Sequence, residues 1–405
     1  MPPAATLRHL QLILPDRISA APLHIGGAHV GAAASPGAWE LDLRDHLVFP
    51  GLINAHDHLQ LNNIPRLPAH PPFPNSYAWV AAFQSHLRDP AVAAAVSRSS
   101  ALRHWQGGLK NLLCGATSVA HHDPWHPVLD HPDFPVHLLR HGGWSHSLGL
   151  GIQTEEVRGV AQFPCYGPPV AASFAATPPG QPWIIHLAEG TDAVAAAELA
   201  QLDGIGCLAA NTVLVHAVGL SDPDIGRAIE RGASVVWCPA SNMSLLGRTI
   251  DPGRLFTANR LALGSDSRIS GGWDLLDELR VAAEQSDLAP ADLLALVTTA
   301  ASRVLAWPEV GGLDPGQRAD LLIVRDPGSD PYQALLDTRR SAIRAVVRGG
   351  APVITDLDFA EWFAVCGVGT VQVVLDGRPK LLARALLGPD GAAALEPGLE
   401  LVCGP

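Results

Sequence analysis

Short runs in which apolar and polar residues alternate lie near both ends of the chain. They read LRHLQLIL and LHIGGAHVG within the first 48 residues, and ADLLIVRD, IRAVVRGG and VQVVLDGRP from residue 319 onward. Alternation with a period of two is typical of strands that bury one face, and Gly or Pro near the end of a run favours a turn. We predict that residues 1–48 and 310–405 together form a small β-sandwich module.

The middle of the chain has a different pattern, in which short apolar runs alternate with Ala-rich stretches. The clearest strand candidates read LINAH, TSVAH, WIIH, TVLVH, SVVW and LALG; VHLLRH, at residues 136–141, is a further one. We expect one more strand between Leu148 and Tyr166. This alternation is typical of βα units around a parallel sheet, and its length matches a TIM-like barrel. We predict an α/β fold in which residues 49–309 form a (β/α)8 barrel.

Polar side chains fall where these predicted strands end. His56 and His58 close the first strand, where alternation places them on one face and turns Asp57 to the other. Later strands end at or just before His186, His216 and Asp266. A single histidine at a strand end is commonly structural, but barrel enzymes build their sites at this edge. Imidazole and carboxylate are the ligand types of a zinc or ferrous site with an open position for water.

Glu189 follows His186 by three residues, directly after a predicted strand. A turn there can bring its carboxylate back over the strand end, where it would be a proton carrier. The alternative is an ordinary glutamate favoured by a helix N-terminus. The neighbouring histidines favour the first interpretation.

Six segments of the chain resemble motifs of one enzyme group. They read PGLINAHDHL, HLAE, VHAVGLSD, VVWCPASNMSLLG, LGSDS and GGLDPGQRADLLIV, and they occur in the group's order over nearly the whole chain. The sequence thereby resembles the amidohydrolase superfamily, in its deaminase and chlorohydrolase branch.

The resemblance implies a role for each matching residue. His56, His58, His186 and Asp266 would bind one divalent ion per chain, Zn²⁺ or Fe²⁺. Glu189 would carry protons, His216 would orient water or polarise the substrate, and Asp266 would take part in catalysis as well as in binding the ion.

Lysine is scarce in this chain, and its scarcity bears on the number of metal ions. Two-metal members of the superfamily use a carboxylated lysine between the first-strand histidines and His186. The lysine in that interval is Lys110, which belongs to the helix before the second strand. The resemblance therefore implies a single metal ion.

Substrate contacts are less well marked in the sequence. We predict them at Gln60, Asn62, His122 and Trp125, which follow the first two strands. The segment AQFPCYGPP, expected near the fourth strand, lacks the histidine that many purine-type deaminases carry there. This departure from the family pattern argues against a purine.

Composition narrows the partners and the compartment. The formal charge of −12 and the lack of a Lys/Arg cluster argue against nucleic acid and anionic membranes. No apolar run approaches the ~20 residues that span a bilayer, and six scattered cysteines without a CxxC pair indicate a reducing compartment. The N-terminus lacks the features of a secretory signal. We expect a cytoplasmic protein with a small-molecule substrate; whether it forms a homodimer stays open.

These features favour a metal-dependent hydrolase that cleaves a C–N bond by attack of activated water on an sp² carbon. Deamination of an aminated heterocycle or an amidine-like carbon is the leading reaction. Opening of a cyclic amide, of the imidazolone type, and ring dechlorination are alternatives at the same site. A non-catalytic scaffold of the same fold is the alternative from another class.

Overall fold

Parallel strands occupy the middle of the chain in the computed structural model, which describes residues 2–67, 72–151 and 167–402. Three of them form one sheet in the order β10-β9-β8, and five form a second sheet in the order β11-β12-β13-β14-β15. Their bounds are β8 Leu52–Asp57, β9 Ala116–His121, β10 His137–Leu138, β11 Gly143–Ser147, β12 Trp183–Leu187, β13 Thr212–His216, β14 Ser234–Trp237 and β15 Leu261–Leu263. The alternation of strands and helices predicted for this region is confirmed.

The two sheets approach each other where β15 meets β8. The Asp266 N–H donates a hydrogen bond to the His56 carbonyl at 3.0 Å, just past the end of β15. Gly264 allows this approach, because a Cβ at that position would lie 2.7 Å from the His56 Cβ. The ends of the first and last parallel strands are therefore packed directly together.

The fourth strand lies earlier than the sequence pattern indicates. β11 covers Gly143–Ser147 and pairs in parallel with β12. Of the predicted range, residues 148–151 form helix α4 (Leu148–Gly151), and residues 152–166 lie outside the described residues. The segment GWSHS carries no continuous apolar run, so its strand conformation depends on pairing with β12 rather than on local pattern.

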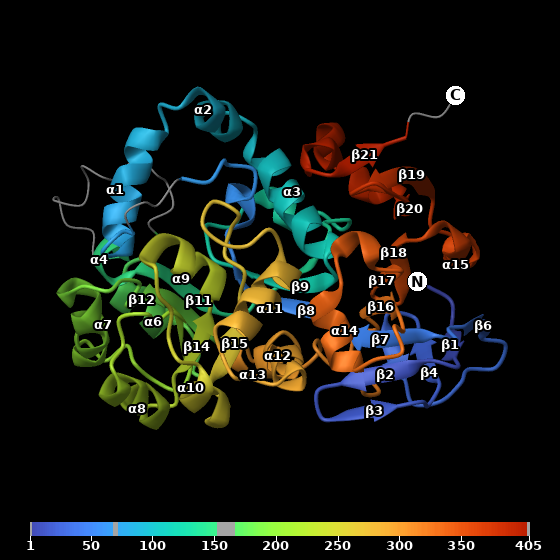
Figure 1. Cartoon of the computed structure of the whole chain (residues 1–405), viewed down its shortest axis with the longest axis horizontal. Helices are drawn as coiled ribbons and strands as arrows, with labels where there is room; N and C mark the ends of the chain where they lie inside the picture. The colour runs from blue at the N-terminus through green and yellow to red at the C-terminus, as the bar shows by residue number, and fades with distance from the viewer. Residues whose placement is uncertain (1, 68–71, 152–166, 403–405) are drawn as a thin grey trace.

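Helices surround the parallel strands (Figure 1). Several begin at side chains that accept a hydrogen bond from the first turn, as Asp192 does for α7 and Ser221 for α8. The helices of this region are α1 Ser76–His86, α2 Pro90–Val96, α3 Ser100–Leu113, α4, α6 Val170–Ala176, α7 Ala193–Gly204, α8 Asp222–Glu230, α9 Pro239–Leu246, α10 Gly253–Thr257, α11 Leu275–Glu284, α12 Pro290–Leu296 and α13 Thr299–Val304. Short 3₁₀ turns η1 (Leu59–Leu61) and η2 (Pro127–Asp130) follow β8 and β9.

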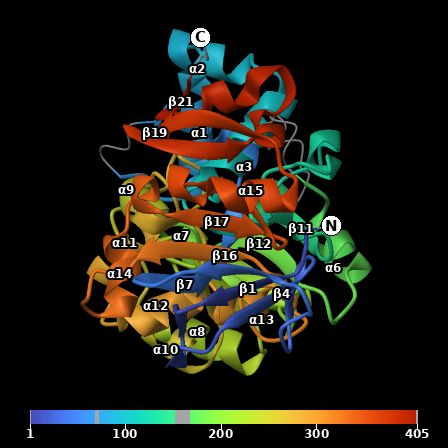
Figure 2. The ribbon, with the colours of Figure 1, turned by 90° about the vertical axis from the view of Figure 1, so that its right-hand side faces the viewer.

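Strands from both chain ends pair with one another beside this α/β region (Figure 2). A nine-stranded sheet has the order β21-β19-β20-β18-β17-β16-β7-β2-β3, and a four-stranded sheet has the order β5-β4-β1-β6. The N-terminal strands are β1 Ala5–Arg8, β2 Gln11–Leu14, β3 Arg17–Ser19, β4 Leu23–Gly26, β5 His29–Gly31, β6 Trp39–Asp42 and β7 His46–Pro50. The C-terminal strands are β16 Leu321–Arg325, β17 Ala345–Arg348, β18 Ala351–Thr355, β19 Thr370–Leu375, β20 Arg378–Ala383 and β21 Leu399–Leu401, with helices α14 Pro331–Asp337 and α15 Ala360–Cys366 between them.

One buried apolar cluster joins these two sheets. It includes Leu7 and Ile25 from the four-stranded sheet and Val48, Ile323 and Val347 from the nine-stranded one. The antiparallel pairing of β7 with β16 brings residues 46–50 against residues 321–325, so the entry into β8 is held by the C-terminal part of the chain. In the part of the chain that the structure describes, no helix is long and apolar enough to cross a membrane.

Candidate active site

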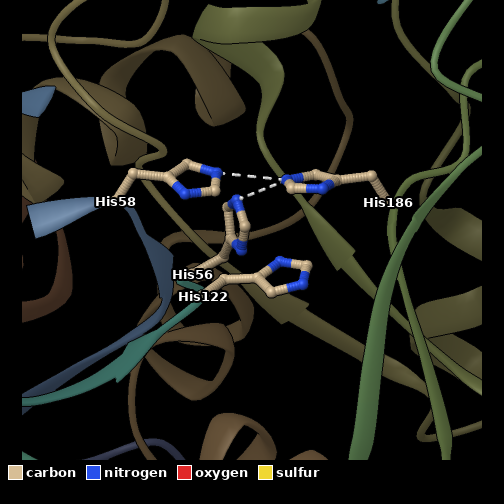
Figure 3. A group of neighbouring side chains, drawn as sticks. All are labelled: His56, His58, His122 and His186. Carbon is tan, nitrogen blue, oxygen red and sulfur yellow. Dashed lines mark hydrogen bonds between the residues drawn. The ribbon is translucent and has the colours of Figure 1, made fainter. Parts of the chain in front are cut away.

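Three histidine side chains converge at the carboxyl ends of β8 and β12 (Figure 3). The Nε2 atom of His186 lies 3.2 Å from the Nε2 atom of His56 and 3.2 Å from that of His58. All three residues are buried. Three imidazole nitrogens this close, from elements far apart in the sequence, form a set of donors able to hold one metal ion.

Hydrogen bonds at the opposite ring nitrogens orient two of these imidazoles. His58 Nδ1 donates to Asp123 Oδ2 at 2.6 Å, and His186 Nδ1 donates to the His146 carbonyl at 2.7 Å. With Nδ1 protonated, the Nε2 lone pair of each ring is left for another ligand. His56 Nδ1 is buried without a hydrogen-bond partner.

Asp266 lies on the fourth side of the convergence point. Its Oδ1 is 3.8 Å from both His56 Nε2 and His58 Nε2. The other oxygen, Oδ2, accepts hydrogen bonds from the Ser241 and Ser270 hydroxyls at 2.8 and 2.7 Å. These two donors hold the carboxylate with one oxygen toward the histidines.

Glu189 and His216 form a second pair next to this group. Glu189 Oε1 lies 3.6 Å from His216 Nε2, and both residues line the same pocket as His58, His186 and Asp266. His216 Nδ1 donates to Asn242 Oδ1 at 2.8 Å. The CPASN segment therefore has a structural explanation at the start of α9: its serine orients Asp266 and its asparagine orients His216.

Burial and neighbouring charges shift the titration of these groups. Burial lowers the pKa of His56 and His186 well below the usual value, and adjacent imidazoles lower it further. Burial alone would also lower the pKa of His58, but the Asp123 carboxylate outweighs it and raises that pKa to about 9. Burial raises the pKa of Glu189, with His216 acting in the opposite direction. A carboxyl group with a raised pKa, close to an imidazole, is suited to taking up and releasing a proton.

The backbone is strained where these side chains leave their strands. Ala188, His216 and Asp266 have φ values of 52°, 73° and 53°. Left-handed φ values in non-glycine residues cost roughly 1–3 kcal/mol each and persist where surrounding contacts enforce them. Such strain at the ends of β12, β13 and β15 is typical of an active site.

A buried polar network lies behind the histidines. Lys110 Nζ donates to Asp57 Oδ2, Ser265 Oγ and the Asp266 carbonyl at 3.1, 3.0 and 2.9 Å. Asp57 also accepts from Asn111 at 2.7 Å. Asp57 thus points away from the convergence point, as alternation along the strand predicts, and Lys110 ties the end of β8 to the end of β15.

The pocket above the site has a polar floor and an apolar wall. Its cavity volume is about 80 Å³. The apolar wall consists of Leu61, Trp79, Val80, Phe83, Leu245 and Ile269. Ser267 also lines the pocket, and its hydroxyl is buried without a hydrogen-bond partner.

The predicted substrate residues lie beside this pocket rather than in its lining. Gln60 Nε2 donates to Asp123 Oδ2 at 2.6 Å, and the Asn62 amide donates to Asp57 Oδ1 at 2.9 Å. Trp125 is 43% exposed and donates to Asp130 Oδ2 at 2.9 Å. In each case the N–H group is bound by an acid of the protein itself, whereas the Gln60 Oε1 atom is buried without a hydrogen-bond partner.

His122 lies under His186, with the two rings stacked at a centroid distance of 4.3 Å. Its Nε2 donates to the Ser145 carbonyl at 2.9 Å, and its Nδ1 is buried without a hydrogen-bond partner. One nitrogen of His122 lies within 4.8 Å of nitrogens from His56, His58 and His186. His122 is therefore a further potential ligand or a packing residue beneath His186.

Two titratable residues of the pocket lining were not predicted from the sequence. Asp123 follows HH at the end of β9, and His146 lies in β11, which the sequence pattern does not mark as a strand. Both line the pocket. The fourth strand, β11, thus carries a histidine that lines the pocket. The argument against a purine was based on AQFPCYGPP, of which residues 161–166 lie outside the described residues, so it stays a prediction.

Comparison with known proteins shows similarity to one family over part of the chain. Residues 171–357 match the amidohydrolase family model. The resemblance to the amidohydrolase superfamily is confirmed.

Among similar proteins, the 8-oxoguanine deaminase of Pseudomonas aeruginosa is 31% identical over 172 residues, 38% of each chain. The 5-methylthioadenosine/S-adenosylhomocysteine deaminase of Haloarcula marismortui is 33% identical over 135 residues, 31% of each chain. The aligned part of this chain therefore spans less than two fifths of these relatives.

Solved structures agree with the chain over a much larger part of their length. Atrazine chlorohydrolase from Arthrobacter aurescens, complexed with zinc, has a TM-score of 0.69 at 18% identity and covers 89% of this chain and 100% of its own. An adenosine deaminase from Xanthomonas campestris with bound zinc has a TM-score of 0.64 at 19% identity, covering 90% and 96%. At such identities the agreement concerns the fold, which this chain shares.

Proposed function

We propose that the protein is a metal-dependent hydrolase that deaminates a small aminated heterocycle. The observation that carries this proposal is the convergence of His56, His58 and His186 with Asp266, next to the Glu189–His216 pair. The relatives named above as deaminases support this reaction. Ring dechlorination, indicated by the chlorohydrolase with the same fold, is the second candidate, and cyclic-amide opening is a third.

The residues present fit one divalent ion. Two imidazoles have Nδ1 engaged and Nε2 directed at the centre, and the fourth donor is a carboxylate. We propose His56, His58, His186 and Asp266 as the ligands, with Zn²⁺ as the ion because the zinc-containing structures share the fold. Fe²⁺ suits the same donor set.

The ion, when bound, supplies Lewis acidity that makes hydroxide available near neutral pH. Glu189 accepts the proton released from water and passes it to the leaving nitrogen. His216 keeps Nε2 beside Glu189 through its bond to Asn242. Ser267 offers its hydroxyl to a ring nitrogen, and the apolar wall covers the remaining face of the ring.

We also propose the finer architecture. The bond between Asp266 and His56 supports closure of the eight parallel strands as a (β/α)8 barrel over residues 49–309. The apolar cluster between the terminal sheets supports a β-sandwich module from residues 1–48 and 310–405.

The test is a screen of amino-heterocycles, chloro-heterocycles and cyclic amides with purified protein. Ammonia, chloride and substrate loss are measured in parallel, and metal is measured per chain. We expect close to one ion per chain and ammonia release equal to substrate loss. Glu189→Gln should keep the metal and lower turnover by a factor of about 10²–10⁴. Glu361→Gln, at an exposed position, should leave both the metal content and turnover unchanged. Full activity in metal-free protein would contradict the proposal.

A further inference from the structure

Glu198 is a buried acid that the proposed reaction does not use. It lies within α7 and is 5% exposed. The N-cap of that helix is Asp192, which accepts from Ala195, so Glu198 has no capping role. No basic side chain lies among the partners of Glu198 in the described structure. A buried carboxylate without a cation is costly and needs a reason to be there.

The two oxygens of Glu198 hold two different elements. Oε2 accepts a hydrogen bond from the Ala188 N–H at 2.6 Å. Oε1 accepts one from the Tyr77 hydroxyl, and the Tyr77 oxygen in turn accepts from the Gly149 N–H at 2.9 Å. The carboxylate therefore connects the loop after β12 with helix α1.

The Ala188 peptide decides where Glu189 points. Ala188 has φ 52°, and its carbonyl accepts from the Gly219 and Gly190 N–H groups at 2.7 and 3.0 Å. The Glu189 carbonyl accepts from the Ser76 N–H, at the start of α1, at 2.9 Å. The N–H and the carbonyl of Ala188 belong to the two peptide units on either side of its Cα. Because Glu198 holds one unit and the glycine N–H groups hold the other, the residue is kept in the left-handed conformation.

Helix α1 carries part of the substrate pocket as well. Trp79, Val80 and Phe83 line the pocket from this helix, and Tyr77 lies within one turn of Trp79 and Val80 on the same helix. Glu198 thus links the apolar wall to the loop that bears the proton carrier.

We propose that Glu198 is a positioning residue, whose carboxylate holds the Ala188 peptide in the conformation from which Glu189 meets His216, and joins that peptide to α1 through Tyr77. This inference rests on the proposed function, because it needs Glu189 to carry protons. A displacement of about 1 Å at a reacting group costs on the order of 10² in rate.

The experiment compares Glu198→Ala, Glu198→Gln and Tyr77→Phe, each alone and combined with Glu189→Gln. The matched control is Asp203→Asn, an acid in the same helix that pairs with Arg231. Turnover, KM and metal content are measured with the substrate found in the screen. Glu198→Ala should lower kcat by about 100-fold, with unchanged metal content and a KM within about threefold. Glu198→Gln keeps an acceptor for Ala188 and should stay within about tenfold of the parent.

The combined variants separate positioning from a general structural role. Because Glu198 acts through Glu189, Glu198→Ala should cause no further loss in the Glu189→Gln background. Losses that multiply, or loss of metal in every Glu198 and Tyr77 variant, would overturn the inference. Should Glu198→Ala fail to fold, Tyr77→Phe still tests the link, and an unchanged kcat there would overturn it. Near-normal turnover in Glu189→Gln itself would instead refute the proton role in the proposed function.

Discussion

At the scale of single residues, the candidate site depends on hydrogen bonds made away from its centre. His58 is held by Asp123, His186 by the His146 carbonyl and His216 by Asn242. Each bond engages Nδ1 and leaves Nε2 free, so the partner decides which nitrogen is a donor to a ligand. Asp123 follows β9, His146 lies in β11 and Asn242 lies in α9, so each partner comes from another element than the histidine that it orients.

Replacing Asp123 should weaken the hold on the metal. Asp123→Ala removes the acceptor at 2.6 Å from His58 Nδ1, so the ring can turn or change tautomer. We expect zinc affinity to fall about 10–100-fold, measured by competition with a chelator of known affinity. Asp130→Ala, an exposed acid in the neighbouring turn, is the control, and equal zinc affinity in both variants would contradict the role.

At the scale of elements, close backbone contacts position the ends of the parallel strands. Helix α3 packs its Gly107 directly on η1, the turn that follows His58. A Cβ on Gly107 would lie 2.1 Å from the Leu59 carbonyl oxygen. This contact brings Lys110 of the same helix within reach of Asp57 and Ser265.

Gly107→Ala should destabilise the fold although alanine favours helices. The added methyl group would force η1 away from α3, and overpacking of this kind costs typically about 1–3 kcal/mol. Gly204→Ala, at the end of α7 with no atom within 4 Å of the added Cβ, should be neutral or slightly stabilising. Thermal unfolding of both variants is the measurement, and equal melting temperatures would show that η1 yields without cost.

At the scale of the whole molecule, buried acids couple stability to pH. Burial raises the pKa of Glu278 from 4.5 to about 8, and this side chain accepts from the Ala240 N–H at 2.8 Å at the start of α9. A folded-state pKa above the unfolded value means that the folded protein binds the extra proton. The contribution of Glu278 to stability therefore falls as pH rises from 4.5 to about 8.

Glu278→Gln should remove this part of the pH dependence. The amide oxygen can still accept from Ala240, and no charge develops in the buried position. Urea unfolding between pH 5 and 8.5 should show the variant gaining stability relative to the parent as pH rises. Glu361→Gln, at an exposed position, is the control and should run parallel to the parent. A difference between Glu278→Gln and the parent that stays constant with pH would contradict the shift.

Most side chains of the candidate site can be predicted from local features of the sequence. Apolar runs mark β8, β12, β13 and β15, and the residues that close or follow them are the histidines and carboxylates of the site. These features are local, because the period of a strand and the residue after it are read within a few positions. For the same reason the orientation of Asp57 away from His56 and His58 was predictable.

Which groups orient these side chains depends on the tertiary structure. Asp123, which follows β9, and Ser241 and Asn242, which lie in α9, contact site residues of other elements. The segment β11 is a strand because β12 pairs with it. Gln60, Asn62 and Trp125 each donate a hydrogen bond to an acid of the protein, while α1 supplies part of the pocket wall. Hydrogen bonds between residues far apart in the chain depend on strand order and helix packing, which no local period encodes.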